Sequence, residues 1–461
     1  MKSSIVFGFC SILSHKVRRY CIIIVLFQIS FAKEMNEEDD ELAKEASSSP
    51  KKHDNESDEK NDVFNDVNET AHFESVCDAY RQYANFAMGE WTSREYRLME
   101  LPDSQHRLLP AGLRFGTATR SKRQKDFKDA VIRNQFCLDC ILRHVGQPHS
   151  QQLQSDKFNV ADEQISKVSS VLKSLTRDWS AYGEKERTAA YGPIKESIKK
   201  YLPLEKYSEG QRLPQIVVPG SGVGRLAFEL AAMGYDVQGN EFSMYMLLAS
   251  DFILNNGGQI FSSERPLHLS PWLLESRNVH ASTDPTSSIQ IPDVDPATML
   301  MQSLDDEERM SSLPAPEFSM AAGDFASIYN GKAEQWDCVA SCFFLDACPN
   351  IVEVLQVIYK MLRPGGLLVN LGPLLYHWSG PPMRPNDKSI KDYRQRFDNL
   401  DDRYLSSINL CYNDVKDIMN EIGFEILEEE TGVECYYTSD QRSMMSTKYR
   451  CVSFVAKKSS H

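Results

Sequence analysis

Apolar positions recur along this chain at two spacings, which divide it into two parts. From Ala71 to about Leu202 they recur every three or four residues between charged ones, which is typical of amphipathic helices. From residue 203 onward, short β-branched runs alternate with segments of helical spacing. The first part therefore predicts a helical N-terminal region at 71–202, and the second predicts an α/β domain at 203–461 with a mostly parallel sheet.

The α/β pattern is clearest where it begins. An apolar β-branched run at 216–218 predicts a strand, and 225–233 has the spacing of a helix that Gly234 closes. Residues 235–240 then predict a second strand, which ends in Glu241. A strand, a turn, a helix and a strand in this order form the first unit of a doubly wound sheet.

Three glycines at every second position, Gly220, Gly222 and Gly224, form the turn between that strand and helix. Glycines suit a tight turn that brings backbone amides and a helix N-terminus against a ligand, so the turn predicts a nucleotide-like molecule. Glu241 follows at the distance where a carboxylate accepts both hydroxyl hydrogens of a ribose. Dinucleotide folds favour G-x-G-x-x-G, whereas this G-x-G-x-G spacing resembles the loop of S-adenosylmethionine (SAM) methyltransferases. A glycine turn in another α/β protein is the alternative.

The remainder of the second part repeats the alternation. The elements expected there are a strand at 338–345, a helix at 351–362, a strand at 367–372, a helix at 415–423, and strands at 424–428 and 449–457, the last one antiparallel. The first of these strands carries Cys342 and ends in Asp346, and side chains at the carboxyl end of a parallel strand face the ligand crevice. Two segments without clear periodicity, 257–318 and 379–410, are insertions, and we expect the first to help cover a substrate.

Two polar positions have both a chemical and a structural interpretation. Asp324, followed by Phe325, is either an acceptor for an adenine amino group or the N-cap of a helix. Arg177 either pairs with a ligand carboxylate or is a solvated charge on a helix.

Cys137 and Cys140, followed by His144 and His149, have the spacing of half a zinc site. No second cysteine pair matches them, and Cys137, Ile141 and His144 share one helical face. A packed core is therefore the favoured interpretation, and we expect no metal.

The net charge of -14 is distributed unevenly. Residues 33–70 hold 14 acidic residues against 5 lysines and almost no large apolar side chain, which predicts a disordered acidic tail. The folded part is only mildly acidic and has no dense basic patch, so we expect no nucleic-acid partner. Eleven scattered cysteines favour reduced thiols in a cytosolic protein over a disulfide scaffold.

Several longer strings together resemble one family. RDWS, VPGSGVGRLAFELA, GYDVQGNEFS, PDVDP, AGDF, CFFLDACPNI, LRPGGLLVNLGPLLYHW and SMMSTKYRCV, within residues 160–457, are similar to strings of the carnosine N-methyltransferases, an N2227-like family of class I SAM-dependent methyltransferases. NLGPLLYH and PDVDP are not general methyltransferase features, which makes the resemblance specific. It implies a Rossmann-like sheet that is mostly parallel and has an antiparallel last strand. This α/β domain follows the N-terminal helical region along the chain and contains the two insertions.

The resemblance also implies which residues bind. The residues implied to contact SAM are Arg177, Gly220 with Gly222 and Gly224 of the same loop, Glu241, Asp324, Phe325 and Cys342. Those implied to hold the dipeptide and act in catalysis are Asp346, His377 and Tyr449. The family has a glutamine three residues before the arginine, and because Ser174 stands there, that contact is not carried over.

The implied reaction is transfer of the SAM methyl group to the imidazole Nδ1 of carnosine, giving anserine, and of related histidine-containing dipeptides. A neutral imidazole has a nitrogen lone pair, so in-line approach to the sulfonium is enough and no covalent catalysis is needed. We expect Asp346 to accept from the ring Nε2–H or to stabilise the developing charge, and His377 and Tyr449 to orient the dipeptide. A satisfied core histidine is the alternative for His377.

Two other functions stay open: methylation of histidine in proteins or other peptides, and an inactive SAM-fold binding protein. The expected partner is a small molecule, and a homodimer is the candidate assembly. Basic residues precede a short apolar run at 21–32, as in a secretory signal, but the run is too short for a stable membrane span. Because SAM is used chiefly inside cells, we expect a cytoplasmic or also nuclear protein, with secretion through the possible leader at 1–32 as the alternative.

Overall fold

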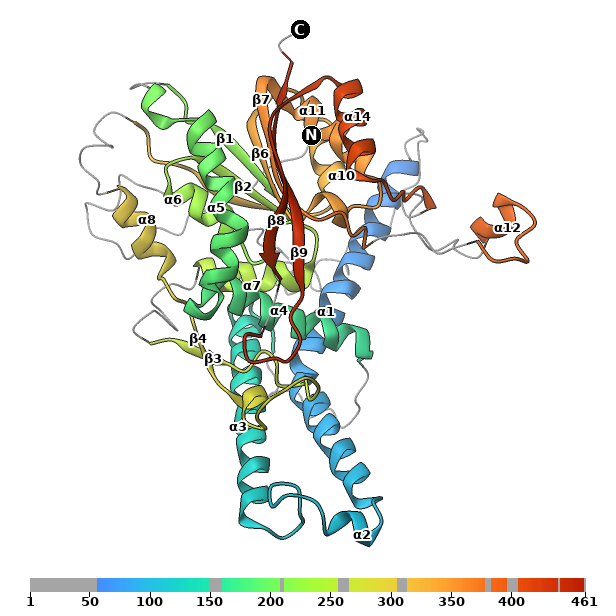
Figure 1. Ribbon diagram of the computed structural model, residues 1–461. Helices are drawn as coiled ribbons and strands as arrows, with labels where there is room; N and C mark the ends of the chain where they lie inside the picture. The colour runs from blue at the N-terminus through green and yellow to red at the C-terminus, as the bar shows by residue number, and fades with distance from the viewer. Residues whose placement is uncertain are drawn as a thin grey trace, which may run out of the picture.

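The computed structural model describes residues 56–148, 160–207, 211–255, 265–304, 313–377, 383–395, 405–437 and 440–459. Within them, seven strands form one sheet in the order β5-β2-β1-β6-β7-β9-β8 (Figure 1). Their bounds are β1 Gln215–Pro219, β2 Asp236–Glu241, β5 Phe318–Ala322, β6 Trp336–Cys342, β7 Leu362–Gly372, β8 Phe424–Tyr436 and β9 Lys448–Lys458.

The sheet is mostly parallel. Strand β1 pairs in parallel with β2 on one side and β6 on the other, while β9 runs antiparallel to both β7 and β8. This confirms the expected mixed sheet and its antiparallel last strand. Because the chain winds outward from β1 in both directions, the strand order reverses between β1 and β6, and the carboxyl ends of these two strands form the crevice where such sheets bind ligands.

Helices cover both faces of the sheet (Figure 1). One face packs against α5 Glu184–Tyr201, α6 Arg225–Ala232 and α7 Met244–Asn255, and the other against α10 Phe325–Tyr329, α11 Ile351–Met361 and α14 Tyr412–Ile422. On the first side, α1 Glu56–Met99, α3 Ala118–His144 and α4 Asp162–Trp179 pack on α7 and continue the same core. The alternation along β1 explains the two cores. Ile216 and Val218 face the first layer, and Val217 faces the second.

The helical N-terminal region is packed into the domain. The buried Tyr80 hydroxyl of α1 donates to the Tyr245 carbonyl of α7 at 2.6 Å. The helices α1 and α3, with the short α2 (Asp103–His106) between them, form an arm that extends beyond the sheet (Figure 1). Helix α1 begins at Glu56, inside the segment 33–70 that composition predicts to be disordered. Residues 1–55, including the apolar run, lie outside the described residues.

The first insertion is more structured than its sequence predicts. Its described part contains β3 Leu267–Leu269, β4 Ile289–Ile291 and α8 Pro296–Leu304, and β3 packs against α3. Of the second insertion, the described part includes α12 Ile390–Gln395.

Element boundaries differ from the prediction in several places. Strand β7 begins at Leu362, five residues before the predicted start at 367, so the residues predicted to form a turn lie within the strand. Strand β6 ends at Cys342, three residues early, because Phe343 adopts a φ of 53° and a 3-10 turn, Leu345–Ala347, follows. Strand β8 extends to Tyr436 because β9 pairs with it over its whole length. Among the described residues, no helix is both long and apolar enough to cross a membrane.

Candidate active site

The glycine turn lies at the carboxyl end of β1, in the crevice. Gly220, Gly222 and Gly224 have φ values of 61°, 56° and 85°, a region that L-residues with side chains rarely adopt. A Cβ on Gly220 would lie 2.9 Å from the Phe344 ring, and one on Gly224 would lie 3.0 Å from Leu254. The loop therefore needs glycine for its conformation and for close packing, as the spacing predicts.

Glu241 ends β2 beside this loop. Its Oε2 accepts from the Gly222 amide at 2.8 Å, and its Oε1 accepts from the Phe242 and Ser243 amides at 2.9 and 2.8 Å. Burial raises the pKa of the Glu241 carboxyl above its ordinary value, and the three amide bonds oppose that shift. The carboxylate thus fixes the loop and keeps lone-pair capacity for a further donor.

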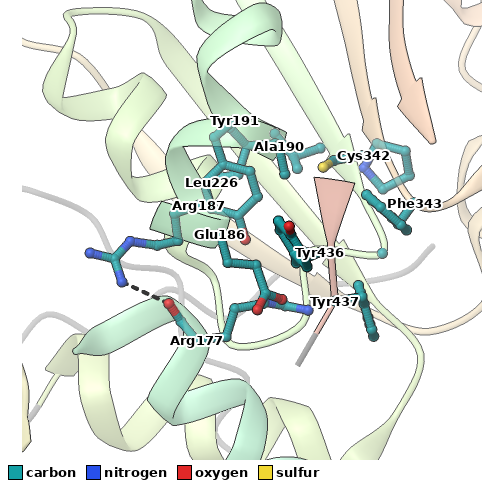
Figure 2. A pocket seen from close by; sticks show the side chains of 14 residues that line it. Arg177, Glu186, Arg187, Ala190, Tyr191, Leu226, Cys342, Phe343, Tyr436 and Tyr437 are labelled. Atoms are coloured by element: carbon teal, nitrogen blue, oxygen red, sulfur yellow. Dashed lines mark hydrogen bonds between the residues drawn. The ribbon is translucent and has the colours of Figure 1, made fainter. Parts of the chain in front are cut away.

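A cavity that is partly open to solvent lies at this end of the crevice (Figure 2). Its lining residues are Arg177, Glu186, Arg187, Ala190, Tyr191, Val218, Pro219, Gly220, Ser221, Leu226, Cys342, Phe343, Tyr436 and Tyr437. Arg177, Gly220 and Cys342 were predicted to bind SAM and are brought together here. Glu241, Asp324 and Phe325 do not line this cavity, because they follow the neighbouring strands β2 and β5.

Arg177 occupies the last turn of α4 and is held by its neighbour. Its Nε and Nη2 donate to the two carboxylate oxygens of Asp178 at 2.7 and 2.8 Å, and its guanidinium lies 5.0 Å from the Tyr437 ring centroid. Asp178 is fully buried and also accepts from the Tyr191 hydroxyl at 2.9 Å. Burial is the largest influence and lowers the Arg177 pKa, but the Asp178 charge and hydrogen bond, together with Tyr191 and Tyr437, outweigh it and leave the pKa well raised. A fixed cation in a ligand cavity is suited to binding a carboxylate.

The structure confirms the N-cap interpretation of Asp324. Its Oδ1 accepts from the Ser327 amide at 2.9 Å at the start of α10. Phe325 is buried, with its ring 5.3 Å from that of Phe344. This contact joins the end of β5 to the segment after β6.

Cys342 has a protonated thiol at neutral pH. Burial raises its pKa to about 12, although the nearby Arg177 charge lowers it. The residue therefore contributes a small neutral surface to the cavity and not a nucleophile.

The predicted substrate residues lie just beyond the cavity. Asp346 is buried in the 3-10 turn after β6, where its Oδ2 accepts from the Leu375 amide at 2.7 Å and its carbonyl accepts from the His377 amide at 3.2 Å. Burial raises the pKa of the Asp346 carboxyl. Tyr449, on β9, packs edge-on against the Phe343 ring at 5.7 Å.

Two positions in this group correct the prediction. Asp346 lies one turn past the strand and not at its end, because the chain turns at Phe343. His377 is exposed in a turn beyond β7, so the interpretation as a satisfied core histidine is wrong.

Cys137 and Cys140 are buried on α3, as the packed-core interpretation predicts. His144 Nε2 lies 3.3 Å from Asp251 Oδ2, and His149 falls outside the described residues. Throughout the described ranges, no group of three or more His, Cys, Asp and Glu side chains has an arrangement that could hold a metal ion.

Sequence reasoning missed several residues that shape the cavity. Asp178 and Tyr191 hold Arg177, and Glu186 lies beside it. The spacing of Tyr191, fourteen residues after Arg177, carries no recognisable motif. The acid directly after the arginine in RDWS was the available signal, since adjacent opposite charges in a buried turn must pair.

Strand β9 lies antiparallel between β7 and β8, and a glycine loop and an acid lie near the point where the strand order reverses. This is the arrangement of class I SAM-dependent methyltransferases, and the protein is assigned to that class. Comparison with known proteins gives the family. Residues 154–460 match the family model for carnosine N-methyltransferase. The chain belongs to the carnosine N-methyltransferase family.

Two carnosine N-methyltransferases and one solved structure are similar to this chain. Carnosine N-methyltransferase of Rattus norvegicus is 34% identical over 391 residues, which cover 85% of this chain and 86% of the rat protein. The Schizosaccharomyces pombe carnosine N-methyltransferase is 34% identical over 64% of this chain and 72% of its own length. A solved SAM-dependent methyltransferase from Methanosarcina mazei is 13% identical, covers 57% of this chain and 98% of its own, and has a TM-score of 0.31.

Proposed function

We propose that this chain transfers the methyl group of SAM to the imidazole Nδ1 of carnosine, giving anserine, and acts likewise on related histidine-containing dipeptides. The observation that supports this most directly is that Phe343 contacts two groups of candidate residues. Phe343 lines the Arg177 cavity and also packs against Tyr449, and Asp346, three residues further on, accepts from the His377 amide. A methyl donor and a small acceptor could therefore meet near that ring.

SAM supplies a methyl group on a positively charged sulfur when it is bound. Its amino-acid end carries a carboxylate and an ammonium group, and the cavity offers Arg177 for the first and Glu186 for the second (Figure 2). Glu241 would accept from the ribose hydroxyls, and the ends of β5 and α10, at Asp324 and Phe325, would receive the adenine. The ligand would then lie across the strand ends from β6 to β5, which are neighbours of β1 and β2 in the sheet.

The acceptor imidazole has to be neutral and correctly oriented. Asp346 would accept from the ring Nε2–H, which leaves the lone pair on Nδ1, and its negative charge would stabilise the imidazolium that forms. His377 and Tyr449 would orient the dipeptide. Asp346, buried and with a raised pKa, provides a strong electrostatic effect in its ionised form because little water screens it.

The test is incubation of the purified chain with methyl-labelled SAM and carnosine, followed by NMR to locate the methyl group on the ring. Methylation at Nδ1 is the expected result, and methylation at Nε2 alone would contradict the proposed tautomer. A panel of carnosine, homocarnosine, free histidine and Gly-Gly-His tests the alternative of peptide histidine methylation. Turnover restricted to Gly-Gly-His would favour that alternative, and SAM binding without any transfer would favour the inactive protein.

A further inference from the structure

We propose that Asp293, in the PDVDP string of the first insertion, is a positioning residue for the methyl-donor site. It acts through Arg187, which fixes the turn that carries Arg177, and through Arg225, which follows the glycine loop. The inference rests on the proposed function in one respect, namely that Arg177 binds the carboxylate of SAM.

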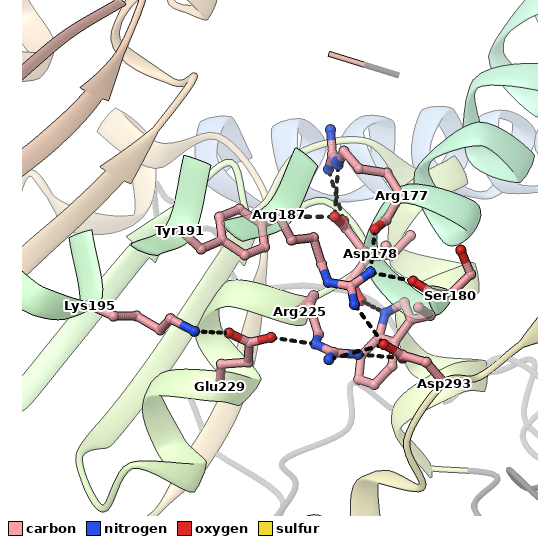
Figure 3. Close-up of polar contacts among 11 residues, drawn as sticks. Arg177, Asp178, Ser180, Arg187, Tyr191, Lys195, Arg225, Glu229 and Asp293 are labelled. Atoms are coloured by element: carbon pink, nitrogen blue, oxygen red, sulfur yellow. Dashed lines mark hydrogen bonds and ion pairs between the residues drawn. The ribbon is translucent and has the colours of Figure 1, made fainter. Parts of the chain in front are cut away.

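Asp293 joins three segments that are far apart in the sequence (Figure 3). Its Oδ2 accepts from Arg187 Nη2 of α5 at 2.6 Å, and its Oδ1 accepts from Arg225 Nη1 of α6 at 2.7 Å. Its backbone amide donates to the Trp179 carbonyl at 3.0 Å. Arg225 Nη2 also donates to Oδ2 at 3.4 Å, so both carboxylate oxygens are used and Oδ2 is shared between the two helices.

Arg187 links Asp293 to the turn that carries Arg177, beside the cavity. Its Nη1 donates to the carbonyls of Arg177 and Ser180, at 2.7 and 2.6 Å. These two carbonyls lie at the end of α4, where the last carbonyls of a helix have no partner within the helix. Arg187 also lines the cavity, so its position affects both the turn and the ligand space.

Arg225 links Asp293 to the glycine loop. It is the first residue of α6, directly after Gly224, and its guanidinium lies 4.8 Å from the Trp179 ring centroid. The Trp179 indole N–H in turn donates to the Val223 carbonyl of the loop at 3.0 Å. The turn that carries Arg177 and the glycine loop are therefore fixed to each other, and Asp293 binds both.

The Asp293 carboxylate balances the charges of two buried arginines. The Arg187 and Arg225 side chains are each less than a tenth exposed, so without Asp293 two buried guanidinium groups would face each other. Glu229 cannot replace it, because its oxygens already accept from Arg225 Nε and Lys195 Nζ. Breaking a buried ion pair from one side leaves an uncompensated charge, and the freed arginine moves toward solvent or the cavity.

The test compares two ligands by calorimetry on the full-length chain: S-adenosylhomocysteine, and its decarboxylated analogue, which lacks only the carboxylate. In Asp293→Asn, we expect the Kd of S-adenosylhomocysteine to rise at least tenfold and that of the analogue to change less than threefold. In this variant Arg187 loses its carboxylate partner and the turn that carries Arg177 shifts, whereas Arg225 keeps Glu229 and the glycine loop keeps the Glu241 carboxylate. Only the first ligand has a carboxylate for Arg177 to bind, so it should be weakened selectively.

Asp337→Asn is the matched control. Asp337 accepts from Arg212 and Arg363, but it lies at the start of β6, at the opposite end of the strand from the crevice. We expect it to destabilise the fold while changing both Kd values less than threefold. If Asp293→Asn fails to fold, Arg187→Lys removes the paired donation to the two carbonyls and should give the same ligand-selective loss.

The outcomes distinguish the positioning role of Asp293 from the proposed methyltransferase function. Equal weakening of both ligands, or a change below threefold for S-adenosylhomocysteine, would overturn the role of Asp293 while leaving the proposed function intact. Wild-type protein that binds neither ligand would overturn the proposed function and this inference together.

Discussion

Single residues in this site are governed by the balance between burial and hydrogen bonding. Asp346 keeps a raised pKa because burial outweighs the Leu375 amide bond and the nearby His377. A carboxyl with a raised folded-state pKa binds protons more readily in the folded chain than in the unfolded one. The free energy of unfolding therefore falls as the pH rises from the pKa of Asp346 in the unfolded chain to its raised pKa in the folded chain. Above that pH range, the ionised Asp346 destabilises the fold.

Asp346→Asn should separate activity from stability. Asparagine keeps an oxygen for the Leu375 amide but removes the buried charge, so we expect the free energy of unfolding at pH 7 to stay equal or rise by about 1 kcal/mol. We expect kcat/KM for carnosine to fall at least 100-fold, because the charge that stabilises the imidazolium is lost. Urea denaturation and steady-state kinetics measure the two. A kcat/KM within about threefold of wild type, a change below 1 kcal/mol, would remove Asp346 from the mechanism.

Cys342 gives a second test at this scale. With a pKa of about 12, it holds roughly a thousandth of the thiolate that an ordinary cysteine holds at pH 8, so alkylation should be correspondingly slow. Cys411 is exposed and serves as the control within the same chain. Peptide mapping after timed iodoacetamide treatment measures both rates. Alkylation of Cys342 as fast as that of Cys411 would show that the thiol is neither buried nor protonated.

Among elements, the turn between α4 and α5 is the most tightly packed part of the site. Gly183 approaches so closely that a Cβ would lie 2.0 Å from the Arg177 carbonyl oxygen, a distance at which the backbone must move. That same carbonyl accepts from Arg187. The local constraint is steric and not conformational, because Gly183 has an ordinary φ of -83°.

Gly183→Ala should therefore disturb both the fold and the ligand site. We expect a loss of about 3 kcal/mol in unfolding free energy and at least a tenfold weaker affinity for S-adenosylhomocysteine. Gly192→Ala is the matched control, since a Cβ there meets nothing within 4 Å and the helical position favours alanine by about 0.5–1 kcal/mol. Denaturation and calorimetry on both variants decide the matter, and similar behaviour of the two would contradict the packing argument.

Elements also show which parts of the structure could be predicted from the sequence. Periodicity located β1, α6, β2 and α11 because each buries a regular face, and spacing located the glycine loop because its backbone demands glycine. Asp293 could not be found this way, since its role depends on three segments meeting in space. The end of β6 was misplaced because an apolar run continues past Phe343, where the chain leaves the sheet.

At the scale of the whole molecule, the N-terminal helices and the sheet share one core. The cluster that contains Tyr80 and Leu138 of the helical region also contains Ile216 and Val218 of β1. Polar contacts cross the same boundary, since the buried Asn134 of α3 donates to the Ser270 carbonyl at 2.9 Å. Neither part can be separated without exposing apolar surface that the other now covers.

The chain should consequently unfold in one transition and not as two domains. Burial of apolar surface is the main stabilising term, and a shared core couples the loss of one part to the loss of the other. Scanning calorimetry should give a single peak whose calorimetric enthalpy equals its van't Hoff enthalpy. Tyr80→Phe, which removes only the hydroxyl that donates to Tyr245, should lower the Tm without splitting the peak. Two resolved transitions, with that substitution shifting only one of them, would show that the helices fold independently of the methyltransferase sheet.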